Sequence, residues 1–530
     1  MELMFIGADH EVTGSCHYLN VGDKHILVDY GMEQGVNVYE NAKLPVSEAM
    51  IDYVLLTHAH VDHSGMLPKL YANGFRGKIY ATKATADLCA IMLRDCAHIQ
   101  QQEAEWKNRK ARRSGNSETE PEYTMEDADN TIRMIVECPY GEKVDICENV
   151  TVQFTDVGHL LGSSSIEVWA TEGKETRKIV FSGDIGNVNQ PLIKDPQYTA
   201  EADYVVMEST YGNRLHEKVR GDMVEELAHQ IQSTFDRGGN LVIPSFAVGR
   251  TQEILYFIRK IKAENMITGH DKFPVYVDSP MAVEATNVFQ KNISECFDEE
   301  AMEYVNAGIN PITFPNLKLS ITGDESKFIN ADPTPKVIIS ASGMCEAGRI
   351  RHHLKHNLWR PESTIMFVGY QAIGTLGRSL VEGTTEVKLF GETIEVKAKI
   401  VQLPGLSGHA DKEGLMKWAG AFDKKPLKYF VVHGDDASAL ELVDTIKTEL
   451  RVSADAPYSG TRFDLISGEY IEIAEPVAVN RKKAVSGVFA RLEAAGARLL
   501  AVIARNKGGT NKDLGKFADQ INALCDKWDR

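Results

Sequence analysis

The sequence predicts an α/β fold in which one β-rich domain is interrupted by a parallel α/β domain and then resumed. The amino-terminal part consists of short strand-like runs separated by glycine turns, and from Asp203 strands and helices alternate. Such alternation is typical of a parallel sheet. After about residue 385 the β pattern returns, and beyond about Pro476 apolar residues fall at helical spacing. The expected segments are 1–207, 208–385, 386–475 and 476–530.

Length and composition limit the class of protein. A chain of 530 residues is too long for one ordinary core, and 43% apolar with 25% charged residues is a globular balance. The net charge of −17 argues against a protein that coats nucleic acid non-specifically, because such binding needs many Lys and Arg contacts with phosphates. It does not exclude a nuclease, since metal ions can supply positive charge at the scissile phosphate.

Cysteine usage and hydropathy predict the compartment. The eight cysteines contain no CxxC pair, which predicts reduced thiols and a cytoplasmic protein. Met1 leads almost directly into strand-like residues 3–7, without a basic or long apolar leader. Because no segment is long and apolar enough to span a bilayer, we expect no membrane partner.

The strongest chemical signal is a cluster of four metal-capable side chains in six residues: His58, His60, Asp62 and His63. The cluster follows the apolar, strand-length run 51–57. In extended backbone, His58 and His60 point the same way and can hold one ion. Asp62 and His63, turned by the loop, would reach a second ion about 3.5–4 Å away. Imidazole mixed with carboxylate suits catalytic zinc, so the motif predicts two Zn²⁺ ions.

Three more polar residues end apolar strands. Asp29 closes the strand 25–30, while His159 and Asp184 stand in glycine turns after strands 152–157 and 179–182. A lone residue of this kind is more often structural, and Asp29 taken alone reads as a turn-former. Beside the histidine cluster, His159 and Asp184 become candidate metal ligands, and Asp29 a carboxylate that orients a metal-bound imidazole.

These spacings resemble those of the metallo-β-lactamase superfamily. Asp29, the 58–63 cluster, His159 and Asp184 match its first four motifs in order and context. The resemblance implies an αββα sandwich with the first zinc held by His58, His60 and His159. It also implies that Asp184 bridges to a second zinc, which Asp62 and His63 hold.

The region after Asp203 predicts a parallel sheet with helices. The expected strands are Tyr204–Glu208, Leu241–Ser245, Val275–Asp278, Val337–Ala341 and Ile365–Val368. The expected helices lie near Lys218–Arg237, Thr251–Glu264, Pro280–Glu295 and Gly348–Leu358. Ligands of such sheets gather at the carboxyl ends of strands. Small residues that lead into helices there suit phosphate, although each loop alone is equally a helix cap.

The resumed β pattern carries two more histidines. Strand-like runs at Glu386–Phe390 and Thr393–Gln402 precede His409, which stands in a glycine-containing turn. A further strand, Lys428–Val432, leads directly into His433. A histidine at this strand end completes the ligand set of a second zinc.

With these residues the resemblance sharpens to the β-CASP nucleases, a branch with a nucleic-acid-handling domain inserted into the lactamase fold. Glu208, His409 and His433 match its motifs A, B and C, and the match spans residues 1–475. Within this branch the chain resembles compact prokaryotic ribonucleases related to the endonuclease of mRNA 3′-end processing. Histidine at motif C implies RNA as the substrate. We expect single-stranded RNA to contact Ser245, Arg250, Ser279, Ser342, Gly343 and Arg349.

The expected reaction is hydrolysis by a hydroxide that bridges the two zinc ions, because metal binding lowers the pKa of water from 15.7 to about 7. Asp62 would help to take its proton, and His409, oriented by Glu208, would protonate the leaving 3′-oxygen. The products would carry 5′-phosphate and 3′-hydroxyl ends. We expect endonucleolytic cutting and leave 5′-exonuclease activity open, because the mode depends on channel closure, which the sequence does not show.

Rival functions explain less of the sequence. A lactonase or thioesterase of the same superfamily would not use an inserted domain of about 180 residues. A DNA nuclease of the same branch is an alternative that a comparison of RNA with DNA would test. A catalytically inactive RNA-binding scaffold is another, but it would require lost ligands, and none is lost.

Two segments outside the motifs keep alternative readings. The helix expected over 85–113 ends in residues 107–113 with five positive charges, which form either a solvated helix face or a polyanion patch. In the tail, Gly508-Gly509 separates two expected amphipathic helices. They either pack on the body or mediate oligomerisation, and the resemblance is compatible with a homodimer. Their apolar residues are Val485, Val488, Leu492, Leu499 and Ile503, then Leu514, Phe517, Ile521, Leu524 and Trp528.

Overall fold

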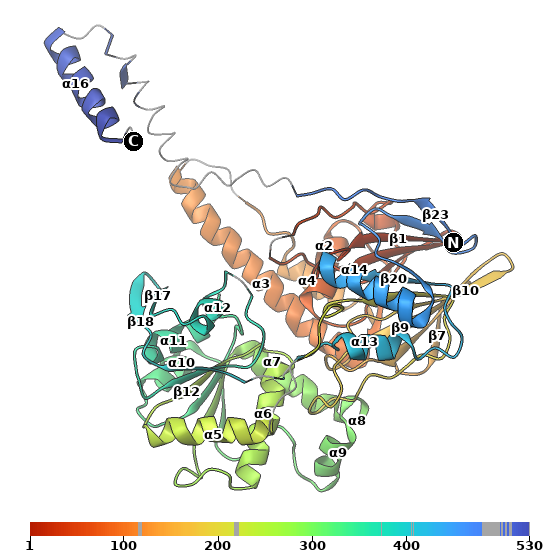
Figure 1. Ribbon diagram of the computed structural model, residues 1–530, viewed down its shortest axis with the longest axis horizontal. Helices are drawn as coiled ribbons and strands as arrows, with labels where there is room; N and C mark the ends of the chain where they lie inside the picture. Colours follow the sequence, from red (N-terminus) through yellow and green to blue (C-terminus); the bar gives the residue numbers. More distant parts are fainter. Residues whose placement is uncertain are drawn as a thin grey trace. The chain divides into compact units, whose positions relative to one another are not determined.

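Three sheets organise the first 476 residues in a computed structural model of the chain (Figure 1). The chain divides into two units, Met1–Pro476 and Val477–Arg530. The structure describes residues 1–35, 37–114, 119–216, 222–372, 374–403, 405, 407–479, 499, 502–503, 506–507 and 511–528. Most of the first expected tail helix lies outside these residues.

The first two sheets face each other across a shared core. The eight-stranded sheet has the order β23-β22-β1-β2-β3-β4-β5-β6, and the seven-stranded sheet has the order β21-β20-β11-β10-β9-β8-β7. Their inward side chains, including Phe5, Phe154 and Phe430, form one buried cluster. Burial of each such side chain contributes about 1.5–3 kcal/mol, so the two sheets hold each other in register.

The strands of these two sheets have the following bounds. The eight-stranded sheet contains β1 (Glu2–Gly7), β2 (Cys16–Val21), β3 (Lys24–Val28), β4 (Tyr53–Leu55), β5 (Lys78–Thr82), β6 (Ile135–Cys138), β22 (Arg462–Asp464) and β23 (Glu469–Glu472). The seven-stranded sheet contains β7 (Lys143–Cys147), β8 (Val150–Asp156), β9 (Ser164–Glu172), β10 (Glu175–Phe181), β11 (Tyr204–Glu208), β20 (Lys428–Val432) and β21 (Ser453–Asp455).

Helices cover the outer face of each sheet. The eight-stranded sheet packs against α2 (Leu67–Ala72), α3 (Lys83–Ser114) and α4 (Met125–Ile132). The seven-stranded sheet packs against α13 (Lys412–Ala419) and α14 (Asp436–Thr445), through Leu415, Trp418 and Leu442. The predicted αββα sandwich is therefore confirmed.

The third sheet is parallel throughout and has the order β14-β13-β15-β12-β16-β19. Its strands are β12 (Leu241–Pro244), β13 (Val275–Asp278), β14 (Leu317–Ser320), β15 (Val337–Ser340), β16 (Thr364–Phe367) and β19 (Lys399–Gln402). Successive residues of a strand face opposite sides. Accordingly, Leu241 and Ile243 pack toward one set of helices and Val242 toward the other.

Helices lie on both faces of this third sheet, as Figure 1 shows for α5 and α6 on one side of β12 and α11 on the other. The first face carries α5 (Met223–Asp236), α6 (Arg250–Ala263) and α7 (Pro280–Lys291), and the second carries α10 (Gly323–Ala331), α11 (Ile350–Asn357) and α12 (Leu376–Val381). Ser279 caps α7 by accepting from the Ala282 amide, and Pro280 follows at the first helical position. This is a favoured helix start.

Short elements complete the fold. They are η1 (Glu48–Met50), α1 (Val61–Ser64), α8 (Ile293–Cys296), α9 (Glu299–Asn306), the hairpin β17 (Glu386–Leu389) and β18 (Glu392–Glu395), and the π-helical turn η2 (Ile446–Leu450). In the second unit, α16 (Asn511–Trp528) matches the second expected tail helix. Among the described helices, none combines the length and hydropathy needed to cross a membrane.

Three strand predictions were wrong or incomplete. β11, expected as the first strand of the inserted sheet, instead lies between β10 and β20 in the seven-stranded sheet. β19, expected in the resumed first domain, pairs with β16 in the six-stranded sheet. β14 was not predicted. The boundaries expected at 207, 385 and 475 stay predictions, and β19 indicates that the inserted sheet reaches beyond residue 385.

Candidate metal centre

One edge of the αββα sandwich collects the polar residues that end its strands. These residues are Asp29 after β3, His58 after β4, His159 after β8, Asp184 after β10, Glu208 at the end of β11 and His433 after β20. His60 precedes α1, which carries Asp62 and His63. Sheet geometry therefore gathers side chains that lie up to several hundred residues apart in the sequence.

The first group of candidate ligands joins three imidazoles and one carboxylate: His58, His60, His159 and Asp184. Nδ1 of His60 lies 3.1 Å from Nε2 of His58 and 3.1 Å from Nε2 of His159. Oδ2 of Asp184 lies 3.4 Å from Nε2 of His58 and 3.3 Å from Nε2 of His159. All four donor atoms therefore face one small volume.

The second group contains Asp62, His63 and His433, again with Asp184 beside it. Nε2 of His63 lies 3.1 Å from Nε2 of His433 and 3.2 Å from Oδ1 of Asp184. Oδ2 of Asp62 is 3.8 Å from Nε2 of His433. The two oxygens of Asp184 thus face different groups, and this carboxylate connects them.

The donor chemistry of both groups fits divalent cations. A proton on Nδ1 of His60 could satisfy only one of the two imidazoles beside it, whereas a cation satisfies all three rings. Oδ1 of Asp184 is buried and makes no hydrogen bond of normal geometry with any described residue. Imidazole and carboxylate without thiolate are the ligands of open zinc sites.

The pKa values of the first group favour metal ligation. Burial and the neighbouring His58 lower the pKa of His60 to about 3, and burial also lowers the pKa of His58 and of His159. These imidazoles are therefore neutral at pH 7, as metal ligands must be. Although burial opposes ionisation of Asp184, the charges of His433 and His63 hold its pKa well below the usual range.

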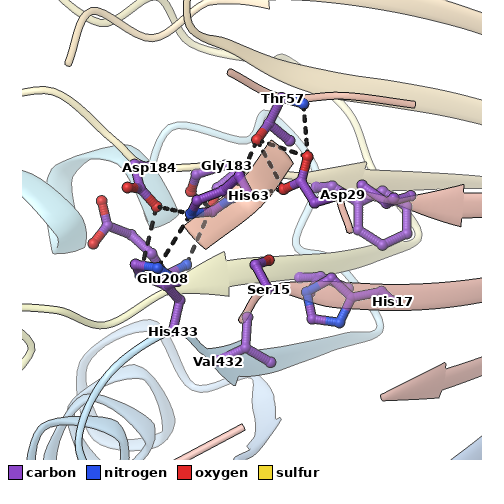
Figure 2. A pocket seen from close by; sticks show the side chains of 14 residues that line it. Ser15, His17, Asp29, Thr57, His63, Gly183, Asp184, Glu208, Val432 and His433 are labelled. Atoms are coloured by element: carbon purple, nitrogen blue, oxygen red, sulfur yellow. Dashed lines mark hydrogen bonds and ion pairs between the residues drawn. The ribbon is translucent and has the colours of Figure 1, made fainter. Parts of the chain in front are cut away.

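Asp29 fixes the orientation of His63, as Figure 2 shows: the ring lies between the carboxylates of Asp29 and Asp184. Nδ1 of His63 donates to Oδ2 of Asp29 over 2.7 Å, which leaves Nε2 free to face the metal centre. Asp29 is held in turn by the amide and the hydroxyl of Thr57, each at 2.8 Å. The carboxylate therefore sets both tautomer and ring plane.

Asp29→Asn should lower zinc affinity by about 10- to 100-fold, because an uncharged amide has only one acceptor oxygen and cannot accept from both the Thr57 amide and Nδ1 of His63. Competition with a chromogenic chelator would measure this. Asp52→Asn is the matched control, since Asp52 binds the His25 amide in the same sheet. Equal affinities in the two variants would remove Asp29 from the metal centre.

His409 lies beside the first group without belonging to either. Nδ1 of its ring is 3.2 Å from both oxygens of Glu208, whereas Nε2 is 3.9 Å from Oδ2 of Asp184. Glu208 is buried and also accepts from the amide of Ile185. Burial lowers the pKa of His409, but the charges of Glu208 and Asp184 outweigh it and raise the pKa to about 9. This geometry suits a proton donor whose Nε2 faces the metal centre.

A small internal cavity of about 20 Å³ lies under the centre (Figure 2). Its lining includes His17, whose Nδ1 is buried and makes no hydrogen bond with the described residues. Burial lowers the pKa of His17 to about 4, so the ring is neutral. Sequence reasoning missed His17 and Thr57, because a lone polar residue inside a strand, or next to a stronger motif, carries no distinguishing pattern.

Three residues at this edge have a strained backbone. Asp29, His159 and His433 have φ values of 61°, 64° and 49°. These values lie in the left-handed region, which residues other than glycine rarely adopt. Each such residue costs of order 1–3 kcal/mol and persists only where the surrounding structure holds it. The fold therefore stabilises sharp turns that aim these three side chains at the centre.

The six residues expected to contact RNA lie in loops at the carboxyl ends of the inserted sheet's strands or in the helices that follow. Ser245 is buried, Ser279 caps α7, and Ser342 and Gly343 follow β15. Arg250 forms an ion pair with Glu253, and NH1 of Arg349 lies 2.7 Å from Oδ1 of Asp278. Both guanidinium groups thus hold carboxylates of the protein, and their contact with RNA stays a prediction.

Three family descriptions match successive parts of the chain. A metallo-beta-lactamase superfamily domain matches residues 18–195, and a Beta-Casp domain matches residues 251–380. A Zn-dependent metallo-hydrolase RNA specificity domain matches residues 393–457. The order agrees with a lactamase-like fold that is interrupted and resumed.

Similar proteins cover most of the chain. Ribonuclease TTHA0252 of Thermus thermophilus is 35% identical over 445 residues, which are 83% of this chain and 95% of that protein. An RNase J-like protein of Methanocaldococcus jannaschii is 32% identical over 87% of this chain and 98% of its own length. Transcription termination factor FttA of Methanothermobacter thermautotrophicus is 30% identical over 86% of this chain and 70% of its own length. Together with the αββα sandwich and its inserted parallel sheet, these matches show that the chain belongs to the β-CASP ribonucleases of the metallo-β-lactamase superfamily.

Proposed function

We propose that this protein hydrolyses phosphodiester bonds of single-stranded RNA at two zinc ions, with 5′-phosphate and 3′-hydroxyl products. The observation that carries the proposal is the position of Asp184, whose two oxygens face two groups of metal-capable side chains. The relatives named as a ribonuclease and as an RNase J-like protein support RNA as the substrate.

His58, His60 and His159 would hold one ion, and Asp62, His63 and His433 the other, with Asp184 shared between them. When bound, the two ions would supply a water of lowered pKa and positive charge against the developing phosphate charge. The protein's own contribution is orientation, because Asp29 fixes His63 and Glu208 fixes His409.

Proton transfer falls to two side chains. His409 keeps Nδ1 on Glu208 and so presents Nε2 to the centre, where it donates a proton to the leaving 3′-oxygen. Asp62 is ionised, because the hydrogen bond from His433 and the charge of His63 outweigh burial and lower its pKa. Its carboxylate accepts a proton from the attacking water.

The inserted domain is the proposed RNA-binding part. Ser245, Ser342 and Gly343 lie in loops at the carboxyl ends of β12 and β15, the edge of a parallel sheet where ligands gather. We propose internal cleavage as the main mode, with 5′-exonuclease activity on the same centre. The homodimer and the cytoplasmic location are further proposals, and all eight cysteines are unpaired, which agrees with a reducing compartment.

Incubation with end-labelled single-stranded RNA tests the proposal. The protein purified without chelator should contain about two zinc ions per chain and cleave RNA but not DNA of the same sequence. Chelator should abolish cleavage, and added zinc should restore it. A ladder of products indicates internal cutting, whereas mononucleotides indicate processive cutting from the 5′ end. The proposal would be refuted if the purified protein contained no transition metal and no added transition metal restored cleavage.

A further inference from the structure

Phe246 is a large aromatic residue that the fold leaves partly exposed to solvent. It is 46% exposed, although its neighbours Ser245 and Ala247 are only 1% and 4% exposed. Full burial of a phenylalanine would stabilise the fold by about 1.5–3 kcal/mol. Because Phe246 is partly exposed, it contributes much less of this stabilisation. Single exposed apolar residues are common, so exposure alone does not indicate a role for Phe246. Its surroundings must supply that evidence.

The backbone under Phe246 is fixed. Its carbonyl oxygen accepts hydrogen bonds from the Thr251 hydroxyl at 2.7 Å and from the Ser245 hydroxyl at 3.1 Å. The amide of Ser245 donates to the carbonyl of Ser340 in β15 over 3.0 Å. These bonds tie the loop after β12 to α6 and to the neighbouring strand, so the position of the ring is set by the sheet.

Two glycines form the floor on which the ring rests. A Cβ atom at Gly343 would lie 3.1 Å from Cδ2 of Phe246, and one at Gly369 would lie 4.0 Å from Cε2. The buried Gln371 amide donates to the carbonyls of Gly343 and Gly369, at 3.1 Å and 3.2 Å. The ring is therefore supported by the backbone of two loops that are themselves linked, and 46% of the residue stays exposed.

The loop that carries Phe246 touches the metal centre's own loop. A Cβ atom at Gly249 would lie 3.2 Å from Cδ1 of Leu160, which directly follows His159. Leu160 also shares a buried cluster with Ala247 and Val248. The loop that carries the ring thus contacts the loop that carries His159.

We propose that Phe246 is a stacking platform for one base of single-stranded RNA beside the metal centre. The proposal rests on the proposed function and deepens it. Unpaired RNA bases are splayed out and stacked on aromatic rings by proteins, and this contact tolerates any base sequence. A rigid, solvent-facing ring next to the reacting phosphate would fix the register of the chain without selecting a sequence.

Phe246→Leu tests the proposal, with Phe246→Trp as the conservative variant and Phe328→Leu as the matched control. Phe328 is a 63% exposed aromatic on α10 of the same domain. Because one stacked base contributes about tenfold or more in affinity, KM for RNA should rise about tenfold in Phe246→Leu. It should stay near the parent value in Phe246→Trp and Phe328→Leu. Unchanged thermal stability and zinc content would show that the variants fold.

A substrate series separates stacking from a merely structural role. A single abasic nucleotide, moved along the RNA, should lower kcat/KM of the parent about tenfold at one position and add no further loss in Phe246→Leu. A 2-aminopurine at that position, added with chelator so that RNA stays intact, should change fluorescence on binding to the parent but not to Phe246→Leu.

The outcomes distinguish this proposal from the proposed function. RNA cleavage by the parent with identical KM, abasic profile and fluorescence in Phe246→Leu would overturn the stacking role and leave the function standing. A Phe246-dependent fluorescence change in a protein that never cleaves RNA would support stacking and overturn the function. A fluorescence change that Phe328→Leu also loses would overturn the assignment to Phe246.

Discussion

Asp184→Ala is expected to lose most of its bound zinc and to cleave RNA about 10³-fold or more slowly than the parent. The carboxylate faces both groups of candidate ligands, at 3.3 Å from Nε2 of His159 and 3.2 Å from Nε2 of His63. Its removal therefore weakens both ion sites at once, and the loss of several kcal/mol of stabilisation corresponds to about three powers of ten in rate.

Metal analysis after gel filtration, together with RNA cleavage rates, measures this effect. Asp145→Ala is the matched control, because Asp145 is an exposed carboxylate on β7 of the same sheet, bonded to the Thr151 hydroxyl. It should keep two ions and the parent rate. Two zinc ions per chain in Asp184→Ala would contradict the shared position of this carboxylate.

His409→Ala should behave differently, with turnover lowered by about 10²- to 10⁴-fold and zinc content unchanged. Its ring is bonded to Glu208 and lies outside both groups of candidate ligands. The loss should depend on the leaving group. A p-nitrophenyl phosphodiester releases a phenolate that needs no proton, so the variant should cleave it at nearly the parent rate.

His270→Ala is the control for His409, since His270 pairs with Asp236 on α5, among residues of the inserted domain. His270→Ala should cleave both RNA and the p-nitrophenyl phosphodiester at the parent rate. Cleavage of RNA by His409→Ala at the parent rate would remove the acid assignment. Loss of zinc in the same variant would instead make His409 a metal ligand.

The candidate ligands could be predicted from sequence because each ends a strand or belongs to one dense cluster. His58 and His433 directly follow apolar runs, and His159 stands in a glycine turn after a strand. A residue that follows a buried strand lies at a sheet edge. The structure brings these residues within a few ångströms of each other, as the spacing suggested. The zinc content of Asp184→Ala tests the role of the candidate ligands.

The assignment of strands to sheets could not be read in the same way. β11 and β19 are short apolar or mixed runs, and a strand buried on both faces has the same pattern in either sheet. Only the pairing of β11 with β20, and of β19 with β16, decides the matter. Pairing across such sequence distances leaves no local signal.

The proposed RNA-binding face was the least predictable part. Arg250 and Arg349 are positive in sequence, yet both form ion pairs with buried carboxylates. Phe246 looks like an ordinary apolar loop residue, and its exposure depends on where Gly343 and Gly369 fall in space. Charge and hydropathy describe a residue, whereas its availability to a ligand depends on neighbours that the fold supplies.

The interrupted sandwich has a consequence for synthesis on the ribosome. β22 pairs with β1, and β20 pairs with β11, although about 460 and 220 residues separate these partners in the chain. When residue 208 emerges, both sheets of the nascent protein still lack the strands that complete them, while the inserted sheet needs nothing beyond β19. The inserted sheet is therefore the first sheet whose strands are all synthesised. The amino-terminal strands of the sandwich stay unpaired, and accessible to chaperones, until the last strands emerge.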